Sequence, residues 1–539
     1  ARRQGGRGLG RGAHGIVLHS DRTPRTAEPV MTRKARRGQR QMRTPGAIAQ
    51  RPWRQPVYRY RPVEIISSDE VEAIHDTGLK VLEEIGMKVL EPRARSYFKV
   101  AGATVDESQM RVRLDRRLLK PLIARAPKSF ILHARNPERN LVIDSHHTVF
   151  SAVGGPAFVS DAARGRRSGT YEELKDFIRL VHSLNILHQE GGGAFEPMDL
   201  PASTRHLDLH YAQITLTDKN WQPLGLGKER ALDGLEMAAM ALGTTREGLL
   251  KTPVFTCVIN TNSPLQLDIP MAEGLITMAE HGQCVVVTPF TLAGAMSPIT
   301  IAGALAQQHA EALAGIALCQ IVRPGAPVIY GGFTSNVDMR TGAPAFGTPE
   351  YTQAAQISGQ LARFIGVPFR SSNVTTANEA DAQAAYESQM ALWGAITGQA
   401  HLILHAAGWL GGGLTASFEK LIIDAEMLQM MSAYLDPPEV TTDTLALDAM
   451  AEVGPAGHYF GASHTMARYE TAFYAPLVSS WENYDNWAER GRRTALDRAH
   501  EIWKKVLSDY EEPTLNPAID EALKAYMERR KREGGAPVN

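Results

Sequence analysis

The chain lacks the residue patterns of several common enzyme classes. Its 539 residues include only three cysteines, Cys257, Cys284 and Cys319, which lie far apart, and they include no closely spaced Cys/His cluster of the kind that holds zinc. Neither a G-x-x-x-x-G-K phosphate loop nor a G-x-S-x-G nucleophile elbow is present. These absences argue against zinc, P-loop and hydrolase-elbow chemistry, and we expect the chain to bind no metal.

Long apolar runs are also missing. No segment approaches the roughly 20 apolar residues of a membrane-spanning helix, and the first residues do not form a signal peptide. Widely separated cysteines are typical of core thiols in a reducing compartment rather than of a disulfide framework. We therefore expect a cytoplasmic protein that does not associate with membranes.

The formal net charge is zero, but the charges are unevenly distributed. Residues 1–61 carry 16 Lys and Arg against Asp21 and Glu28, a surplus of 14, so the rest of the chain carries about −14. We predict a basic disordered arm over 1–61, although such a tail also suits RNA, and because Met31 opens "MTRKARRG" we expect 1–30 to be upstream sequence. The acidic remainder favours a cationic small molecule or a basic partner over nucleic acid.

Three further regions follow the basic arm. Residues 62–145 alternate helical patterns such as "SSDEVEAIHDTGLKVLEEIG" with short β-like runs, which predicts an N-terminal α/β cap. Residues 146–435 form the regular central region, and residues 436–539 form a C-terminal helical extension rich in Tyr, Trp and Arg. A hydrophobic content of 43% is enough for one large core.

Eight short apolar runs recur in the central region at intervals of 30 to 43 residues, with a helical pattern in every gap. These runs are "VFSAVGG" (149–155), "NILHQEGGG" (185–193), "WQPLGLG" (221–227), "VFTCVIN" (254–260), "CVVVTPF" (284–290), "PVIYGG" (327–332), "PFRSSNV" (368–374) and "HLILHAAG" (401–408). Apolar strands that alternate with helices indicate a parallel sheet covered on both faces. The spacing is close to that of a (β/α)8 TIM barrel, which we predict for residues 146–435.

Tufts of Gly, polar and aromatic residues end most of these strands, as in "QEGGG", "YGGFTSN" and "SSNVTTAN". The carboxyl ends of barrel strands meet at one mouth, where active sites lie. Aromatic rings with a nearby carboxylate suit a quaternary ammonium ion, which has no N–H to donate. The candidates at the mouth are Glu190, Phe195, Phe290, Tyr330, Phe333 and Trp409, although each ring also fits ordinary core packing.

Polar candidates lie at the same strand ends. Arg370 is placed to clamp a substrate carboxylate through two hydrogen bonds, with a structural ion pair as the alternative. His405 suits either a polar contact in the mouth or a buried core histidine. Asn260, Asn373 and Asn378 are possible hydrogen-bond partners of a ligand or of their own loops. We assign no catalytic acid or base, because no acid–base pair is evident.

Five longer segments of the chain show a family resemblance. They are "GPAFVSDAARGRRSGTYEELKDFIRLV", "VDMRTGAPAFGTPEY", "TTANEADAQAAYES", "GWLGGGLTASFEKLIIDAEML" and "GHYFGASHTMARYETAFYAPLVSSWENYDNWAERG". Over roughly residues 60–530 the chain resembles the trimethylamine methyltransferase family of corrinoid-dependent enzymes. The resemblance implies a TIM barrel that moves a methyl group from an amine to Co(I) of a separate corrinoid protein, which carries the methylcobalamin cofactor.

The resemblance also narrows the class of substrate that we expect. Archaeal trimethylamine enzymes of the family carry pyrrolysine, whereas ordinary residues occupy the corresponding region near 371–378 here. The non-pyrrolysine branch includes enzymes that demethylate glycine betaine, so a quaternary amine of this type is the expected substrate. A quaternary ammonium leaves as a neutral tertiary amine and needs no general acid, so the enzyme would act by positioning and desolvation.

On this interpretation Arg370 and His405 contact a carboxylate or the corrinoid, and the cation site is formed by Glu190, Phe290, Tyr330, Phe333 and Trp409. The glycines expected to face the corrinoid are Gly191, Gly192, Gly411 and Gly412. Alternatives are a trimethylamine or other methylamine methyltransferase, a non-catalytic betaine-binding barrel, or a barrel enzyme of other chemistry such as a lyase. We also expect a homo-oligomer.

Overall fold

The computed structural model describes residues 48–538, so the part of the predicted disordered arm (1–61) that covers residues 1–47 lies outside the described residues. Residues 48–61 run in extended form along the body rather than projecting freely. The Tyr58 hydroxyl donates a hydrogen bond to the Ala400 carbonyl, and Arg51 forms an ion pair with Asp436. Within the described residues no helix is both long and apolar enough to cross a membrane.

The N-terminal region forms a small α/β unit. Its helices are α2 (Ser68–Lys80), α3 (Pro92–Ala101) and α4 (Arg116–Ile123), with a π-helical turn at Val81–Ile85. Strands β1 (Met87–Val89), β2 (Thr104–Asp106) and β3 (Arg111–Arg113) form one sheet with β12 (Gln266–Leu267) of the central region, in the order β12-β1-β3-β2, so that only β1 pairs with β12. A hairpin of β4 (Phe130–Leu132) and β5 (Leu141–Ile143) follows.

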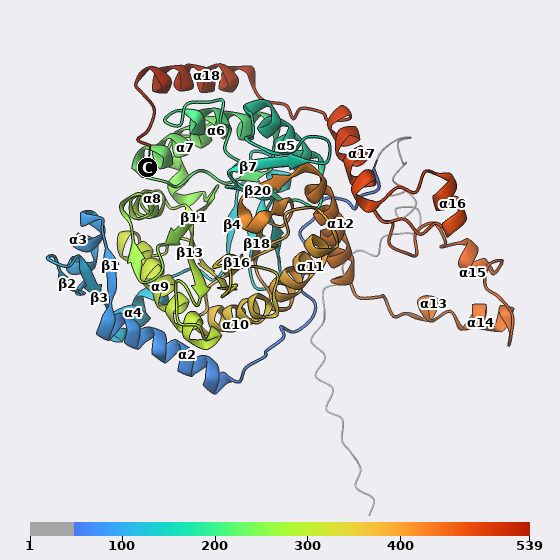
Figure 1. Cartoon of the computed structure of the whole chain (residues 1–539), viewed down its shortest axis with the longest axis horizontal. Helices are drawn as coiled ribbons and strands as arrows, with labels where there is room; N and C mark the ends of the chain where they lie inside the picture. The colour runs from blue at the N-terminus through green and yellow to red at the C-terminus, as the bar shows by residue number, and fades with distance from the viewer. Residues whose placement is uncertain (1–47, 539) are drawn as a thin grey trace, which may run out of the picture. The chain divides into compact units, whose positions relative to one another are not determined.

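All eight predicted β runs contain strands. These are β6 (Val149–Phe150), β9 (Gln189–Glu190), β10 (Asn220–Trp221), β11 (Thr256–Thr261), β13 (Cys284–Ala293), β14 (Val328–Gly331), β17 (Phe369–Ser372) and β18 (Leu402–Leu404). Parallel pairing runs from β11 through β13, β14, β17 and β18 to β6, and β9 pairs with β10. The result is a mixed α/β fold in which a ring of helices surrounds parallel strands (Figure 1).

The hydrogen-bonded ring of strands has one gap. An isolated bridge between Ser151 and Gln189 joins β6 to β9, but no backbone pairing joins β10 to β11 in residues 48–538. Side chains span the gap instead, because the Asn220 amide donates to the Val254 carbonyl at 2.7 Å and the Gln189 amide donates to Thr256 Oγ1 at 3.0 Å. The predicted closed barrel is therefore not fully hydrogen-bonded.

The helices that separate the strands bury one side against them. They are α5 (Tyr171–Ser183), α6 (Arg205–Leu216), α7 (Lys228–Ala241), α8 (Ile269–Glu280), α9 (Ile301–Val322), α10 (Pro349–Ile365), α11 (Ala382–Thr397) and α12 (Phe418–Tyr434). Helix α9 is buried continuously from Ala304 to Gln320, because α2 and α4 of the N-terminal unit cover the side that faces away from the strands. Its many Ala and Gly residues allow this close packing on both sides.

Two short sheets extend the strand ends. One contains β7 (Phe158–Asp161), β8 (Gly165–Arg167), β19 (Trp409–Leu410) and β20 (Thr415–Ser417). The other joins β13 to β15 (Phe333–Val337) and β16 (Pro344–Ala345).

The C-terminal region contains α13 (Thr442–Leu445), α14 (Leu447–Val453), α15 (Ser463–Met466), α16 (Tyr484–Glu489), α17 (Ala495–Ser508) and α18 (Pro517–Arg532).

Candidate functional site

A cavity of about 350 Å³ lies at the carboxyl ends of the parallel strands. Each of the eight strands contributes a wall residue within it or just after it, and these residues are Ala152, Gly191, Gln222, Asn260, Thr288, Phe333, Arg370 and Leu404. Other wall residues include Gly192, Phe290, His405, Trp409 and Gly413. The predicted position of the site at the strand ends thus coincides with a cavity large enough for a small molecule.

Among the described residues that line this cavity, Arg370 is the only Asp, Glu, Lys or Arg. It lies on β17 and its side chain is 2% exposed. Its Nε and Nη1 atoms have no hydrogen-bond partner in the described part of the chain, and its Cζ lies 4.9 Å from the centre of the Phe333 ring. Burial lowers the pKa of Arg370 to about 10, so the guanidinium still carries its charge at neutral pH.

His405 lies beside Arg370 in the wall, at the end of β18. Its backbone φ of 52° is in the left-handed region, which turns the chain sharply after the strand. Its ring packs 4.5 Å from that of Trp409, and its Nδ1 has no partner within residues 48–538. Burial, with a smaller contribution from Arg370, holds the pKa of His405 well below its usual value. The imidazole is therefore neutral at physiological pH.

Three aromatic wall residues, Phe290, Phe333 and Trp409, form a cluster with Phe346, which packs behind them and does not itself line the cavity. The ring centre of Phe333 lies 5.2 Å from that of Phe290, 5.7 Å from Phe346 and 6.3 Å from Trp409. The Trp409 indole donates a hydrogen bond to the Thr375 carbonyl, which fixes its orientation. Our candidates did not include Phe346, because it lies outside the eight predicted β runs. The segment "VDMRTGAPAFGTPEY", which contains Phe346, was the available signal.

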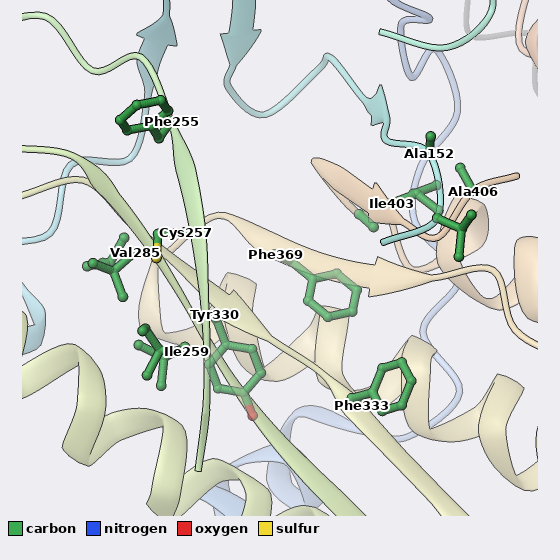
Figure 2. Packing of buried hydrophobic residues seen from close by; sticks show 14 of the residues in the cluster. Ala152, Phe255, Cys257, Ile259, Val285, Tyr330, Phe333, Phe369, Ile403 and Ala406 are labelled. Carbon is green, nitrogen blue, oxygen red and sulfur yellow. The ribbon is translucent and has the colours of Figure 1, made fainter. Parts of the chain in front are cut away.

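Several predicted residues lie outside the cavity wall. The hydroxyl of Tyr330 is engaged with Gln308 and His309 on α9, and Figure 2 shows its ring among buried side chains. Phe195 packs edge-on against Phe177, and Asn373 donates its amide to the Ala406 carbonyl. These side chains stabilise the strands and loops around the cavity.

Glu190 and two of the predicted glycines also fall outside the wall. The Glu190 carboxylate accepts hydrogen bonds from the backbone N–H groups of Gly192 and Gly193 and from the Gln213 amide. Burial raises the pKa of Glu190, although these donors oppose the shift. Gly411 and Gly412 lie in a short turn next to the wall residue Gly413, and Asn378 is exposed nearby. Glu190 therefore shapes the Gly191–Gly193 rim rather than presenting a carboxylate to the cavity.

A buried ion pair supports the His405–Trp409 segment from behind. Lys420 and Asp424 are both fully buried on α12 and form a salt bridge. The second oxygen of Asp424 accepts a hydrogen bond from the Gly408 N–H at 2.8 Å, and Lys420 Nζ donates to Ser388 Oγ. Sequence reasoning missed this pair, although an acidic residue four positions after a lysine on a helix was a visible signal.

Within residues 48–538, no group of three or more His, Cys, Asp or Glu side chains is arranged to hold a metal ion. The three cysteines are buried and unpaired, and burial raises the pKa of each thiol. Thiolate nucleophiles are thus disfavoured at all three positions. The chemistry available in the cavity is one buried cation, a neutral imidazole, amide and hydroxyl groups, and a set of aromatic rings.

Comparison with known proteins places this chain in a family. The family model for trimethylamine methyltransferase (MTTB) matches residues 32–535. The chain is 38% identical to a glycine betaine methyltransferase from Desulfitobacterium hafniense strain Y51, over 87% of this chain and 98% of that protein. It is 28% identical to the trimethylamine methyltransferase MttB of D. hafniense strain DSM 10664 / DCB-2, over 87% and 94% of the two chains.

Among solved structures, the crystal structure of the hydroxylamine complex of MtmB is similar at a TM-score of 0.45 and 10% identity, covering 83% of this chain and 94% of that chain. The protein is a methyltransferase. It belongs to the trimethylamine methyltransferase (MTTB) family, which confirms the resemblance seen in the sequence.

Proposed function

We propose that the enzyme demethylates a quaternary amine that carries a carboxylate, such as glycine betaine. The observation that carries this proposal is the buried Arg370 in the cavity wall. Its Nε and Nη1 atoms have no hydrogen-bond partner in the described part of the chain. A buried guanidinium with unmet donors is costly unless a ligand pairs with it. A carboxylate can pair with the Nε–Nη2 edge or with the Nη1–Nη2 edge of the planar guanidinium, and either arrangement would give one of these two atoms a partner together with a second hydrogen bond through Nη2.

The charge of the wall argues against a bare methylammonium ion as the substrate. No Asp or Glu of the described region lines the cavity, so a substrate with a net positive charge would meet the positive charge of Arg370 without compensation. A betaine is a zwitterion and carries its own balancing charge. The substrate named for the relative at 38% identity, glycine betaine, has this property.

The aromatic rings give the ammonium end of the substrate a suitable surface. Phe290 and Trp409 lie in the same wall as Arg370 and offer π faces, whereas one face of Phe333 is already occupied by the guanidinium. Cation–π contacts of this kind are weak enough to release a charge that disappears during the reaction. We therefore assign Phe290 and Trp409 to the methylammonium group and Phe333 to support of Arg370.

The methyl acceptor that we propose is the corrinoid of a separate carrier protein, which in its Co(I) state supplies the nucleophile. The cavity rim suits a broad flat group, because Gly155, Gly191, Gly192 and Gly413 line it and a Cβ atom on Gly155 would meet no atom within 4 Å. We also propose that the eight strands, including the gap at β10 and β11, form a TIM barrel whose mouth receives the carrier.

The residues of this chain need only bind and orient the substrate. When the methyl carbon is attacked in line, the C–N bond breaks and its electron pair stays on nitrogen, which leaves as a neutral tertiary amine. No proton has to be delivered, and this agrees with the neutral, buried state of His405. Fixing the carboxylate at Arg370 would direct one N-methyl group toward the rim and exclude water from it.

A matched pair of substrates tests this proposal. Glycine betaine and choline share the trimethylammonium group, but glycine betaine carries a carboxylate where choline carries a hydroxymethyl group. With the enzyme and a Co(I) corrinoid carrier, we expect dimethylglycine from glycine betaine at a rate at least 100-fold above demethylation of choline, trimethylamine or tetramethylammonium. Equal rates for glycine betaine and choline would overturn the role of the carboxylate, and no demethylated product from any amine would indicate a binding protein.

A further inference from the structure

The C-terminal region contains a long segment whose apolar side chains face solvent. We call residues 437–484, which include α13, α14 and α15, the apolar arm. Six aromatic side chains of this arm are 47% to 86% exposed, and they are Tyr459, Phe460, Tyr469, Phe473, Trp481 and Tyr484. Monomeric proteins rarely expose so many large apolar side chains in one segment, and such surfaces mark interaction sites.

The apolar arm is structured despite this exposure. Arg468 forms an ion pair with Asp443, and the Ser463 hydroxyl donates to the Glu452 carboxylate, so the arm is held by contacts of its own. At its far end the N–H group of Val478, just before Trp481, donates a hydrogen bond to the buried Glu426 of α12. The exposed rings are thus displayed on a defined scaffold.

The exposed area is large enough for a stable protein interface. An aromatic side chain buries about 150–250 Å² when it is fully covered, so six side chains at these exposures offer roughly 800 Å². That is about the area that each partner contributes to a stable interface of standard size.

A second apolar surface lies on the helices next to the root of the arm. Tyr386 and Met390 of α11 and Met430 and Tyr434 of α12 are exposed, and Tyr60 stacks on Tyr434 with ring centres 5.7 Å apart. We call these five residues the α11–α12 patch. Trp393 of α11, one turn after Met390, packs edge-on against Tyr434 at 5.2 Å, so the two helices are in contact beside these exposed side chains.

We propose that the apolar arm of one copy of this chain covers the α11–α12 patch of a second copy. The arm begins three residues after Tyr434, so patch and arm are adjacent in the chain. A two-fold axis close to Tyr434 would therefore place each arm over the patch of the other copy. Both halves of the contact are on one chain, as a two-fold symmetric interface requires. Its apolar, aromatic character is typical of a permanent homodimer rather than of a carrier that must dissociate in each cycle.

Paired substitutions test this exchange by sedimentation velocity on the full chain at micromolar concentration. The arm variant is Phe460→Asp/Phe473→Asp and the patch variant is Tyr386→Asp/Met390→Asp. The control is Val100→Asp on α3, where an apolar side chain is equally exposed but lies outside both surfaces. We expect the unmodified chain and the control to be dimers or larger assemblies, and each paired variant to weaken association at least 100-fold while its circular dichroism spectrum is unchanged.

Mixing the two variants gives a second, sharper readout. An arm variant retains its patch and a patch variant retains its arm, so a mixed dimer has one intact contact of two. We expect the equimolar mixture to associate more tightly than either variant alone. A monomeric unmodified chain, or paired variants with the mass of the unmodified chain, would overturn the proposal. If the arm variant kept its mass but lost transfer to the corrinoid carrier, the arm would be a docking surface for that carrier instead.

Discussion

Two buried cations of this protein, Arg370 on β17 and Lys420 on α12, differ in their surroundings. Around α12, Lys420 is paired with Asp424, donates to Ser388, and belongs to a network that also holds the Gly408 backbone. Around the end of β17, Arg370 has no carboxylate partner within residues 48–538 and retains unmet donors there at Nε and Nη1. A satisfied buried charge fixes the local structure, whereas an unsatisfied buried charge beside a cavity indicates a ligand.

The largest effect should come from removing the unpaired cation. Arg370→Met should lower kcat/KM for glycine betaine about 1,000-fold, because two charge-assisted hydrogen bonds to the carboxylate are lost. Melting temperature should stay the same or rise, since an unpaired charge leaves the interior. Steady-state kinetics and thermal denaturation measure both quantities. Arg370→Lys, which keeps the charge but not the planar fork, is the matched control and should lose less activity.

Removing the paired cation, Lys420, should mainly lower stability, in contrast to the removal of Arg370. Lys420→Met leaves Asp424 buried without its partner and should lower the free energy of unfolding by about 3 kcal/mol. Urea denaturation measures this loss. Adding Asp424→Leu to the variant should restore part of the stability, because the orphaned charge is then removed. A Lys420→Met protein as stable as the unmodified one would show that the pair is not structural.

Lowering the pH should reduce the free energy of unfolding before the carboxylates become protonated. Burial lowers the pKa values of His188, His210 and His309 to about 3, whereas an unfolded histidine titrates near 6.5. The unfolded state therefore binds more protons below pH 6.5, so the free energy of unfolding should fall there by up to about 1.4 kcal/mol per pH unit for each histidine. Urea titrations between pH 5 and 8 measure the slope. A stability that is constant from pH 8 to pH 5 would contradict this account.

The smallest effect should come from removing one ring of the aromatic cluster. Phe346→Leu removes one ring beside Phe333 and Trp409 without adding a polar group. Aromatic pairs of this kind contribute about 0.5–1.5 kcal/mol, so kcat/KM should fall roughly 3- to 10-fold. The same substitution at Phe369, which is buried outside the cavity wall, is the control and should change stability rather than kcat/KM.

The sequence predicted the order of elements well. The eight β runs contain the eight parallel strands, because apolar runs bounded by Gly and polar residues are a local signal. The gap between β10 and β11 was not predictable, because it depends on side chains such as Asn220 replacing backbone pairing across 34 residues. The exposed arm was predicted only as a helical extension, since composition does not show which side chains face solvent.

The candidate site was predicted in part. Phe290, Phe333, Arg370, His405 and Trp409 all line the cavity. Glu190 and Tyr330 also end strands, but their side chains turn to Gly193 and to α9, and a strand end does not reveal which way a side chain points. Phe346 reaches the cluster from a loop, and this required the three-dimensional path of the chain.

The most direct test of the central claim is the ratio of kcat/KM for glycine betaine to kcat/KM for choline, measured in the unmodified enzyme and in Arg370→Met. If Arg370 holds the carboxylate, the ratio is at least 100 in the unmodified enzyme and falls close to 1 in the variant. A ratio that the substitution leaves unchanged would show that the carboxylate is recognised elsewhere.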